Sequence, residues 1–540
     1  MDKSQEEKEK LQTTEDIVKY IKKETSNTSD ITYREVSVLD ETIYLVFSEP
    51  MTSSSDISDF VIRSIKDIIK ANEESNKLTK INNNIDEYID DGLEVEKKRK
   101  IKINRRNEKL IEKLNNNKYL ANEIIDKLEE NIAISKVKKI DITKDDIFYY
   151  IFSGFTCIIY NKDILVVETK GSLDRTISTP TVENTVKGPK DAFTENYQSN
   201  IGLIRKRIKS EKLVIEENKI GRRSKTKVGL AYIYDIARPD VINHIKEKLM
   251  SIDIDAILDS NYIMELIEEK GKTNFPTVIS TERPDLVSNY LLQGRIALIV
   301  ENSPFALVIP AFLDDFINNI EDNYQKSSDV TLTKFVRYIA FFITIFTPAI
   351  YIALTTYNQE AIPTELLISF VAQREGVPFP AFLEAFLMIL SFEILREGDY
   401  RVPGASGSTL SIVGALILGD AAVSAGIVSP IMIIVIAITT ISGLMFSDLN
   451  MLNALRHWRI IFLVLAAVSG LIGLGVATML LFIKITSTTS FEKAFSYPVA
   501  PINIKGLMDK VIKRESTARS YQREQILTDN ITKYKTNKEN

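Results

Sequence analysis

The stretch from Arg401 to Phe446, RVPGASGSTLSIVGALILGDAAVSAGIVSPIMIIVIAITTISGLMF, decides how the rest of the chain must fold. From Leu410 onward it carries a single charged residue, Asp420. A surface helix needs a polar face, which this run lacks, and one bilayer crossing needs about 20 apolar residues. The run is long enough for two crossings, with Gly, Ser and Pro where turns would fall. It therefore predicts an integral membrane protein.

Further apolar runs lie on either side of this stretch. They are Tyr338–Leu354, which contains Pro348, then Phe379–Leu395 and Ile460–Ile483. Five full crossings from a cytoplasmic start would leave the C-terminal tail outside. That tail is rich in Lys and Arg, which favour the inner side of a membrane. We therefore expect one segment, Thr409–Val428, not to cross as a simple helix.

Short apolar strands alternate with amphipathic helices before the first apolar run, which predicts a layered α/β fold with a largely parallel or mixed sheet. The predicted fold class is an α/β cytoplasmic N-terminal region of two subdomains, followed by an α-helical polytopic membrane domain. The expected parts are a disordered N-terminus (1–30), a first α/β subdomain (31–222) with an Asn/Lys-rich insertion (74–117), a second α/β subdomain (223–325), a transmembrane domain of four or five spans (336–484) and a basic C-terminal tail (485–540).

Composition and motifs argue against several classes of function. A formal net charge of -5 gives no reason to expect a nucleic-acid partner. No glycine-rich phosphate loop opens a predicted helix, and His244 and His457 are too isolated to be metal ligands. We expect no enzyme, no cofactor and no metal. The N-terminus has no apolar signal-peptide core, so the residues before the first span are predicted to remain in the cytoplasm.

Several short strings of residues follow one another in a characteristic order and spacing. They include Gly188-Pro189 with Phe193-Thr194-Glu195, Phe275-Pro276-Thr277 with Thr281-Glu282-Arg283-Pro284-Asp285, Val377-Pro378-Phe379-Pro380, Glu393-Ile394-Leu395-Arg396-Glu397, and Ile412-Val413-Gly414-Ala415. In order and spacing these strings resemble the A-subunit family of spore germinant receptors, the GerA family. The resemblance covers roughly residues 145–485.

This resemblance implies a multi-pass subunit in the inner membrane of dormant spores, with its N-terminal region in the cytoplasm. It implies a homo-oligomer, pentameric in the family, whose membrane domains form a nutrient-gated cation channel. The implied partners are a transporter-like B subunit, to which nutrient recognition is chiefly attributed, and a lipoprotein C subunit.

Four residues are candidates for a pore or a gate: Glu384, Glu393, Asp420 and Pro348. Acidic groups inside apolar runs are costly unless they face water or a partner, and rings of such groups attract cations. For Glu384 we favour a water-lined interior. Glu393 fits slightly better as a packing partner of Arg396 or Arg401. Asp420 fits either gating or a hydrogen bond to a broken helix end.

Other residues are candidates for structural or coupling roles. They are Arg175, Glu183, Arg283, Arg401 and Pro403 for coupling, and Ser469, Gly473 and Ala477 for helix packing. Arg283 could bind an anion, but a structural pair with a nearby carboxylate is the better interpretation. The packing residues lie four apart, and small side chains at that spacing let helices approach closely.

Two alternatives to a channel stay open. One is a scaffold that relays a signal through the α/β subdomains without conducting ions. The other is a secondary transporter, which broken helices and an acid in the membrane would favour. Against a transporter, the chain has few spans and no internal repeat is apparent in the sequence.

Overall fold

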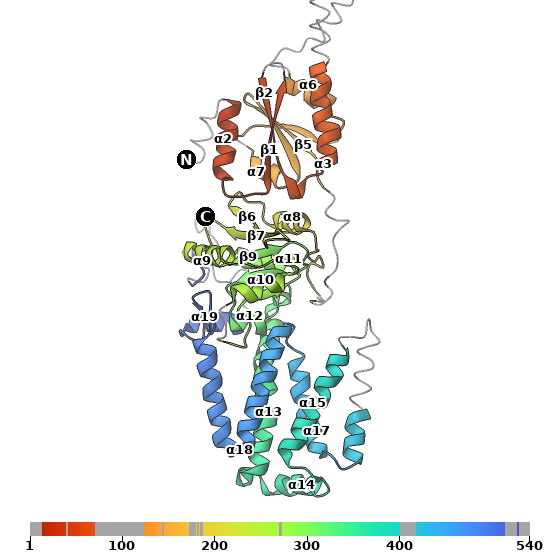
Figure 1. Ribbon diagram of the computed structural model, residues 1–540, viewed down its shortest axis with the longest axis vertical. Coiled ribbons are helices and arrows are strands. Elements are labelled where there is room, and N and C mark those ends of the chain that lie inside the picture. Colours follow the sequence, from red (N-terminus) through yellow and green to blue (C-terminus); the bar gives the residue numbers. More distant parts are fainter. Residues whose placement is uncertain are drawn as a thin grey trace, which may run out of the picture.

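The computed structural model describes residues 13–38, 41–70, 124–134, 136–142, 145–171, 180, 183, 187–268, 273–399, 417–512 and 526–528. Two β-sheets with their covering helices lie one above the other, and a group of apolar helices extends below them (Figure 1). We call the part up to residue 323 the α/β region and residues 327–487 the helical region. The expected insertion at residues 74–117 lies outside the described residues.

The first unit of the α/β region is a five-stranded sheet in the order β1-β2-β4-β5-β3. Its strands are β1 (Ile31–Val38), β2 (Glu41–Ser48), β3 (Val137–Ile140), β4 (Phe155–Tyr160) and β5 (Asp163–Glu168). Helices α2 (Thr14–Glu24) and α7 (Ile147–Ile151) cover one face. The other face is covered by η2 (Ile57–Ile62) with the residues that follow to 70, and by α6 (Ile124–Asn131). The short helices η1 (Glu49–Met51) and α3 (Ser54–Asp56) lead from β2 to η2.

The second unit is also a five-stranded sheet, in the order β6-β7-β9-β10-β8. Its strands are β6 (Leu213–Ile220), β7 (Thr226–Ile233), β8 (Ile279–Thr281), β9 (Ile296–Val300) and β10 (Ala306–Ile309). Helices α8 (Tyr197–Arg207) and α11 (Pro284–Leu291) cover one face, and α9 (Pro239–Met250) and α10 (Ser260–Ile267) cover the other. Two short helices, α12 (Leu313–Ile317) and η5 (Ile320–Asn323), lead to the helical region.

The two units repeat one topology. In each, the sheet order is first, second, fourth, fifth and third strand, and corresponding helices lie on corresponding faces. Helix α2 corresponds to α8, and α7 corresponds to α11. The sequence does not reveal this repeat, because an antiparallel sheet constrains the apolar pattern of its strands and leaves the particular residues free.

The expected strands are largely present, but their direction was predicted wrongly. Every strand pair among the described residues of both units is antiparallel, so the largely parallel or mixed sheet is wrong. The strands come mostly as hairpins, β1-β2, β4-β5, β6-β7 and β9-β10, whose short connections cannot make a parallel crossover. The expected subdomain boundary at residue 222 falls inside the β6-β7 hairpin, so α8 and β6 belong to the second sheet.

The expected disordered N-terminus is wrong from residue 13 onward. Thr13 and Asp16 form a capping box at the start of α2, and Ile17, Val18 and Ile21 are buried against the first sheet. Thr13 and Asp16 have the spacing of a capping box, so the sequence carried a signal for this helix that was overlooked.

The helical region contains α13 (Ser327–Thr356), η6 (Gln359–Ala361), α14 (Thr364–Arg374), α15 (Ala381–Asp399), helical residues 417–424, α17 (Pro430–Gly443) and α18 (Leu449–Ser487). Among the described helices, α13 and α18 are long and apolar enough to cross a membrane, by length and composition. Helix α17 is apolar but shorter. The side chains of α14 are largely exposed, and this helix lies across the far end of the region (Figure 1).

Helix α18 is a hairpin of two arms joined at Gly470. This glycine has φ 61° and ψ -134°, which lies outside the helical range, and the two arms flank α13 in Figure 1. A straight 39-residue helix would be about 58 Å long, roughly twice the hydrocarbon thickness of a bilayer. Tyr357 at the end of α13 donates to the carbonyl of Ala467 (2.8 Å), and Leu471 donates to Asn358 (3.3 Å), which fixes the turn. The single span expected over Ile460–Ile483 is therefore wrong.

After the second arm of α18 the chain returns to the α/β region. It forms the small ribbon β11 (Thr489–Ser490) and β12 (Lys493–Ala494), then α19 (Ile504–Val511). Ser490 donates to the carbonyl of Thr277 (2.6 Å), and Phe495 packs against Phe275. The described part of the C-terminal segment thus lies on the side of the helical region where the sheets are.

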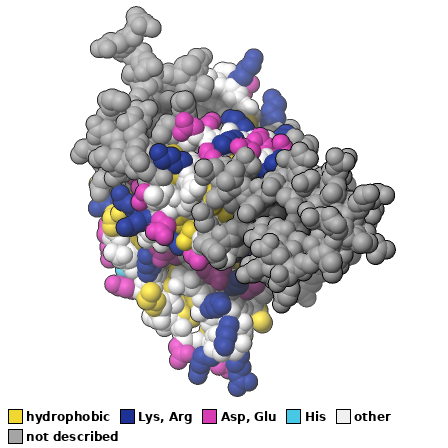
Figure 2. Space-filling view, turned by 90° about the horizontal axis from the view of Figure 1, so that it is seen from above, with side chains coloured by type: hydrophobic (Ala, Val, Ile, Leu, Met, Phe, Trp, Pro, Cys, Tyr) yellow, Lys and Arg dark blue, Asp and Glu magenta, His cyan; other side chains and the backbone are white. Residues whose placement is uncertain are grey.

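The surface differs between the two ends of the molecule. Seen from above, the described residues show basic and acidic side chains intermingled, without an extended apolar patch (Figure 2). In the helical region many large apolar side chains are exposed, such as Leu332, Phe342, Ile441, Ile472 and Met479. The described surface of the helical region is therefore richer in large apolar side chains than that of the α/β region.

Candidate functional site: charged pairs in the helical region and at its junction with the sheets

Glu384 lies at the meeting point of three helices. It stands in the first turn of α15, and its side chain is fully buried. One carboxylate oxygen accepts hydrogen bonds from the backbone N–H (2.9 Å) and hydroxyl (2.8 Å) of Ser429, the residue that precedes α17. The other oxygen lies 3.3 Å from Nε of Arg374 at the end of α14, an ion pair without hydrogen-bond geometry.

This geometry corrects the expected environment of Glu384. We expected water around it because its basic neighbours in sequence would have to reach inward, and Arg374 does reach it. A carboxylate beside the N-terminus of a helix is favoured by the helix dipole. The contact with Ser429 therefore ties α15 to α17. Arg374 and Arg396 are the basic residues nearest to Glu384 in the sequence, and Arg374 is the one that reaches it. Ser429 was not predicted as a partner of Glu384.

Glu393 is surrounded by three arginines. It forms ion pairs with Arg396, with Nη2 of Arg459 (3.0 Å) and with Nε of Arg456 (3.6 Å). Arg396 is one of the two packing partners predicted for it, and Arg401 lies outside the described residues. The two arginines of α18 were not predicted as partners. The cluster joins α15 to the first arm of α18.

The remaining pore candidates differ in their environments. Asp420 is exposed on the helical residues 417–424. Pro348 is buried inside α13.

Of the packing candidates, two lie where the arms of α18 meet. Gly473 and Ala477 are buried, and a Cβ added to Gly473 would collide with the carbonyl oxygen of Leu465 in the other arm. Ser469 is exposed beside the turn. The close approach is thus between two arms of one chain.

Charged pairs also join the second sheet to the helical region. Arg295 at the start of β9 donates to both oxygens of Asp315 in α12 (2.6 and 2.8 Å). Burial raises the pKa of Asp315, but Arg295 and the backbone N–H of Phe312 more than offset this, so the pKa lies below its usual value. Arg337 in α13 donates to Asp322 (2.8 Å). These pairs fix the short helices between sheet and span.

Asp314 adds a second attachment. It accepts a short hydrogen bond from Tyr338 of α13 and lies 3.1 Å from Nζ of Lys510 in α19. One carboxylate thus contacts both the first long helix and the C-terminal segment.

The coupling candidates Glu183 and Arg283 lie near the same junction. Arg283 forms a buried pair with Asp285 (2.8 and 3.0 Å), as predicted for a structural pair, and Asp285 also accepts from Tyr324 (2.7 Å). Glu183 accepts from the hydroxyl of Thr281 (2.6 Å), and burial raises its pKa to about 7. The other candidates, Arg175, Arg401 and Pro403, lie outside the described residues.

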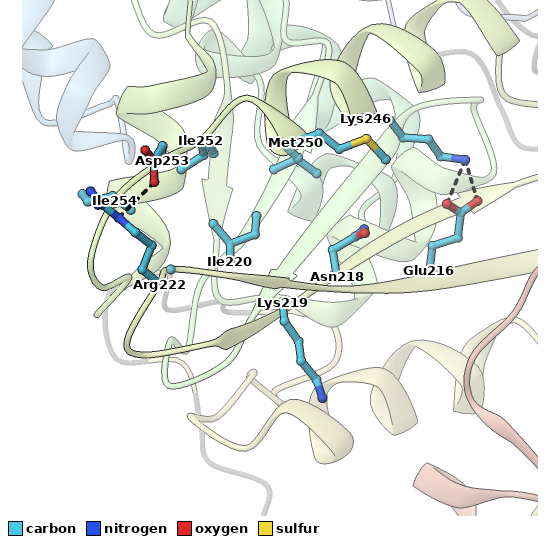
Figure 3. Close-up of a pocket in the computed structure, with 12 residues that line it drawn as sticks. Glu216, Asn218, Lys219, Ile220, Arg222, Lys246, Met250, Ile252, Asp253 and Ile254 are labelled. Carbon is cyan, nitrogen blue, oxygen red and sulfur yellow. Dashed lines mark hydrogen bonds and ion pairs between the residues drawn. The ribbon is translucent and has the colours of Figure 1, made fainter.

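A cavity of about 320 Å³ lies between β6 and the end of α9 (Figure 3). Glu216 and Lys246 form an ion pair at one end (2.8 Å), and Arg222 and Asp253 form another at the other end (3.0 Å). Ile220 contributes an apolar surface between them. Sequence reasoning missed this cavity because its residues come from a strand, a helix and a loop.

Comparison with known proteins finds similarity to spore germination proteins. The family model described as "Bacillus/Clostridium GerA spore germination protein" matches residues 19–526. Spore germination protein KA of Bacillus subtilis is 40% identical over 72% of this chain and 71% of its own length. Spore germination protein B1 of the same organism is 33% identical over 75% of this chain and 87% of its own length.

Two further similar proteins are a membrane protein and a domain of known structure. The membrane protein YfkQ of Bacillus subtilis is 38% identical over 65% of this chain and 68% of its own length. The crystal structure of the N-terminal domain of the A subunit of the Bacillus megaterium spore germinant receptor GerK3 matches at 27% identity, over 56% of this chain and 97% of that domain, with a TM-score of 0.37.

The structure defines a class of protein in which an α/β region of two sheets is joined by buried ion pairs to a region of long apolar helices. Within that class, this chain belongs to the GerA family of spore germination proteins. The resemblance found in the sequence is therefore confirmed.

Proposed function

We propose that this chain is the A-type membrane subunit of a spore nutrient-germinant receptor, and that several copies together form a nutrient-gated cation channel. Membership of the GerA family and two long apolar helices support the membrane-subunit part. The proposed partners are a transporter-like B subunit and a lipoprotein C subunit, in the inner membrane of the spore.

The observation that carries this proposal is one continuous hydrophobic core from the second sheet into the helices. Phe275, beside β8, stacks on Trp458 of α18, with ring centroids 6.3 Å apart. Phe275 and Phe316 also pack against Phe495. Packed cores transmit displacement because they contain little free space. A movement of the second sheet on nutrient binding to the receptor would therefore move α18.

The proposed topology has α13 leaving the cytoplasm and α18 crossing twice, so that the C-terminal segment returns to the cytoplasmic side. Cysteines introduced at Arg223 and Thr356 test it, since Cys157 is buried and should not react. An impermeant thiol reagent added to intact cells should label only the Thr356 site. Labelling of the Arg223 site would contradict the topology.

Within the helical region we propose that the Glu384–Arg374 pair holds the closed state and that the carboxylate contributes to cation passage when the pair separates. A ring of carboxylates in an oligomer would favour cations. Glu384→Gln keeps the shape and removes the charge. Spores that carry this variant should release less cation after nutrient addition, with an assembly of unchanged size.

A matched control is Glu365→Gln, an exposed acid on α14, which should leave cation release unaltered. Glu393→Gln should have a smaller effect than Glu384→Gln, because arginines already surround Glu393. Unaltered release from the Glu384→Gln variant would remove this carboxylate from the ion path.

A non-conducting scaffold is the second candidate. It is favoured by one observation, namely that Glu384 and Glu393 are both engaged in ion pairs within a single chain. Nutrient-dependent ion flux through the reconstituted receptor would exclude the scaffold. Saturable exchange of a substrate would instead select a transporter.

A further inference from the structure

Helix α19 has its apolar face turned outward. Ile504, Leu507 and Met508 have the i, i+3, i+4 spacing of one helix face, and they are 70%, 38% and 48% exposed. In a water-soluble protein such a face normally lies against the core. Here the opposite side is attached to the protein, through the ion pair of Lys510 with Asp314. The exposed face continues into the preceding segment, where Ile502 is 82% exposed.

The position of α19 along the helical region is fixed by a contact with α13. Nζ of Lys334 donates to the backbone carbonyl of Lys510 (2.9 Å). Lys334 and Arg337 are the last charged residues of α13 before the uncharged run Tyr338–Leu354. Helix α19 therefore lies at the boundary between the charged and the apolar part of α13. Figure 1 shows it at the level of α12, beside the end of the second arm of α18.

We propose that α19 lies flat on the membrane surface, with Ile504, Leu507 and Met508 inserted among the headgroups of an anionic lipid leaflet. An amphipathic helix at this depth buries its apolar face at the boundary of headgroups and acyl chains. The sequence IKGLMDKVIKR (504–514) contains more Lys and Arg than Asp and Glu, a balance that matches anionic lipid. Phe335 of α13, the residue after Lys334, is also an exposed apolar side chain.

This inference rests on the proposed membrane placement of the helical region, and the test separates the two. The full chain is reconstituted into vesicles of phosphatidylcholine with phosphatidylglycerol. A spin label is attached to a single cysteine introduced at Ile504, at Met479 in the second arm of α18, or at Arg223 on the second sheet. Collision with oxygen reports lipid, and collision with a nickel chelate reports water.

The ratio of oxygen to nickel collisions at Ile504 should be several-fold higher than at Arg223 and should approach the ratio at Met479. It should fall in vesicles of phosphatidylcholine alone, and an equal ratio in both would overturn the preference for anionic lipid. A label at Ile504 that meets the nickel chelate as readily as at Arg223 would overturn the inference.

Protection of Ile504 from both reagents would also overturn it, because a second copy or another protein would then cover the face. If the label at Met479 itself meets water, the proposed membrane placement fails, whatever the result at Ile504. A double variant, Ile504→Ser with Met508→Ser, should leave the Met479 ratio unchanged while a label at Leu507→Cys moves into water.

Discussion

The two units of the α/β region are joined by one buried ion pair, which gives the sharpest stability prediction. Arg205, at the end of α8 in the second unit, donates to both oxygens of Asp30, just before β1 in the first (2.7 and 2.9 Å). Both side chains are essentially inaccessible, at 0% and 1% exposure. The guanidinium also donates to Thr28 and lies over the ring of Phe152, 4.1 Å from its centroid.

Asp30→Asn removes the negative charge and keeps the shape. It leaves the buried guanidinium without its counter-charge, and removing one partner of a buried pair costs about 3 to 5 kcal/mol. Because the partners come from different units, most of this cost should appear as opening of the joint. A factor of ten in an equilibrium corresponds to about 1.4 kcal/mol, so the open fraction should rise by at least about 100-fold.

Hydrogen exchange measures this opening directly. The backbone N–H of Ser29 donates across the joint to the carbonyl of Ile215 (2.9 Å). Its exchange rate should rise by about 100-fold or more in the Asp30→Asn variant, while amides in the centre of each sheet keep their protection. The matched control is Lys212→Gln, which breaks an exposed pair with Asp235 (3.0 Å) and should change exchange at Ser29 by less than about tenfold. An equal response in both variants would refute the reasoning.

Two further predictions concern the hairpin of α18 and the pH dependence of the junction. Gly473→Leu should lower the thermal stability of the detergent-solubilised protein without blocking membrane insertion, because any Cβ there would meet Leu465. Gly475→Ala is the control, since nothing lies within 4 Å of its added Cβ, and equal melting of both variants would contradict the prediction. The stability of the wild-type protein should fall as the pH rises from about 4.5 to about 7. Over that range the folded state retains a proton on Glu183 that the unfolded state has lost. The free energy of unfolding should therefore fall by at most about 3 kcal/mol as the pH rises. Glu183→Gln should remove this part of the pH dependence in thermal unfolding measured between pH 4.5 and 7.5, and an unchanged profile would mean that the carboxyl titrates normally.

The sequence predicted the elements of the α/β region better than their arrangement. Runs such as FTCIIY and ILVVE are apolar enough to be strands in any sheet, and they form β4 and β5. Their direction depends on the lengths of the connections, which place β4 and β5 in one hairpin. Alternation of helices and strands favours parallel crossovers, but in each unit helices also connect antiparallel strands.

The sequence predicted the acidic residues of the candidate site better than the partners that these acids contact. An acid inside an apolar run is visible in the sequence, and Glu384 and Glu393 were identified in this way. Their partners depend on contacts between helices. Arg374 is near Glu384 in sequence but reaches it only through the turn between α14 and α15, and Arg459 comes from a helix far along the chain. Sequence patterns indicate which charge needs a partner, and the packing of helices decides which partner it has.

On the proposed topology, the break at Gly470 resolves a conflict that the sequence raised. Counted as one span, Ile460–Ile483 left the basic tail on the wrong side, and hydropathy alone gives no reason to divide it. The turn depends on one glycine at positive φ and on Tyr357 and Asn358, more than 100 residues away, which bind the adjacent backbone. Once the chain turns there, Lys510 can reach Asp314 at the base of the sheets.

This return has a mechanical consequence for the proposed receptor. The second sheet is attached to the start of α13 through the Asp322–Arg337 pair, and to the segment after α18 through Asp314 and Lys510. A rigid displacement of the sheet would therefore act on both long apolar helices at their upper ends. The lower ends are fixed to each other by the contacts of Tyr357 and Asn358 at the turn. Helices held together at one end and displaced at the other must tilt against each other. We infer that tilting of α13 against α18, rather than vertical sliding, is the movement by which the α/β region would change the packing around Glu384.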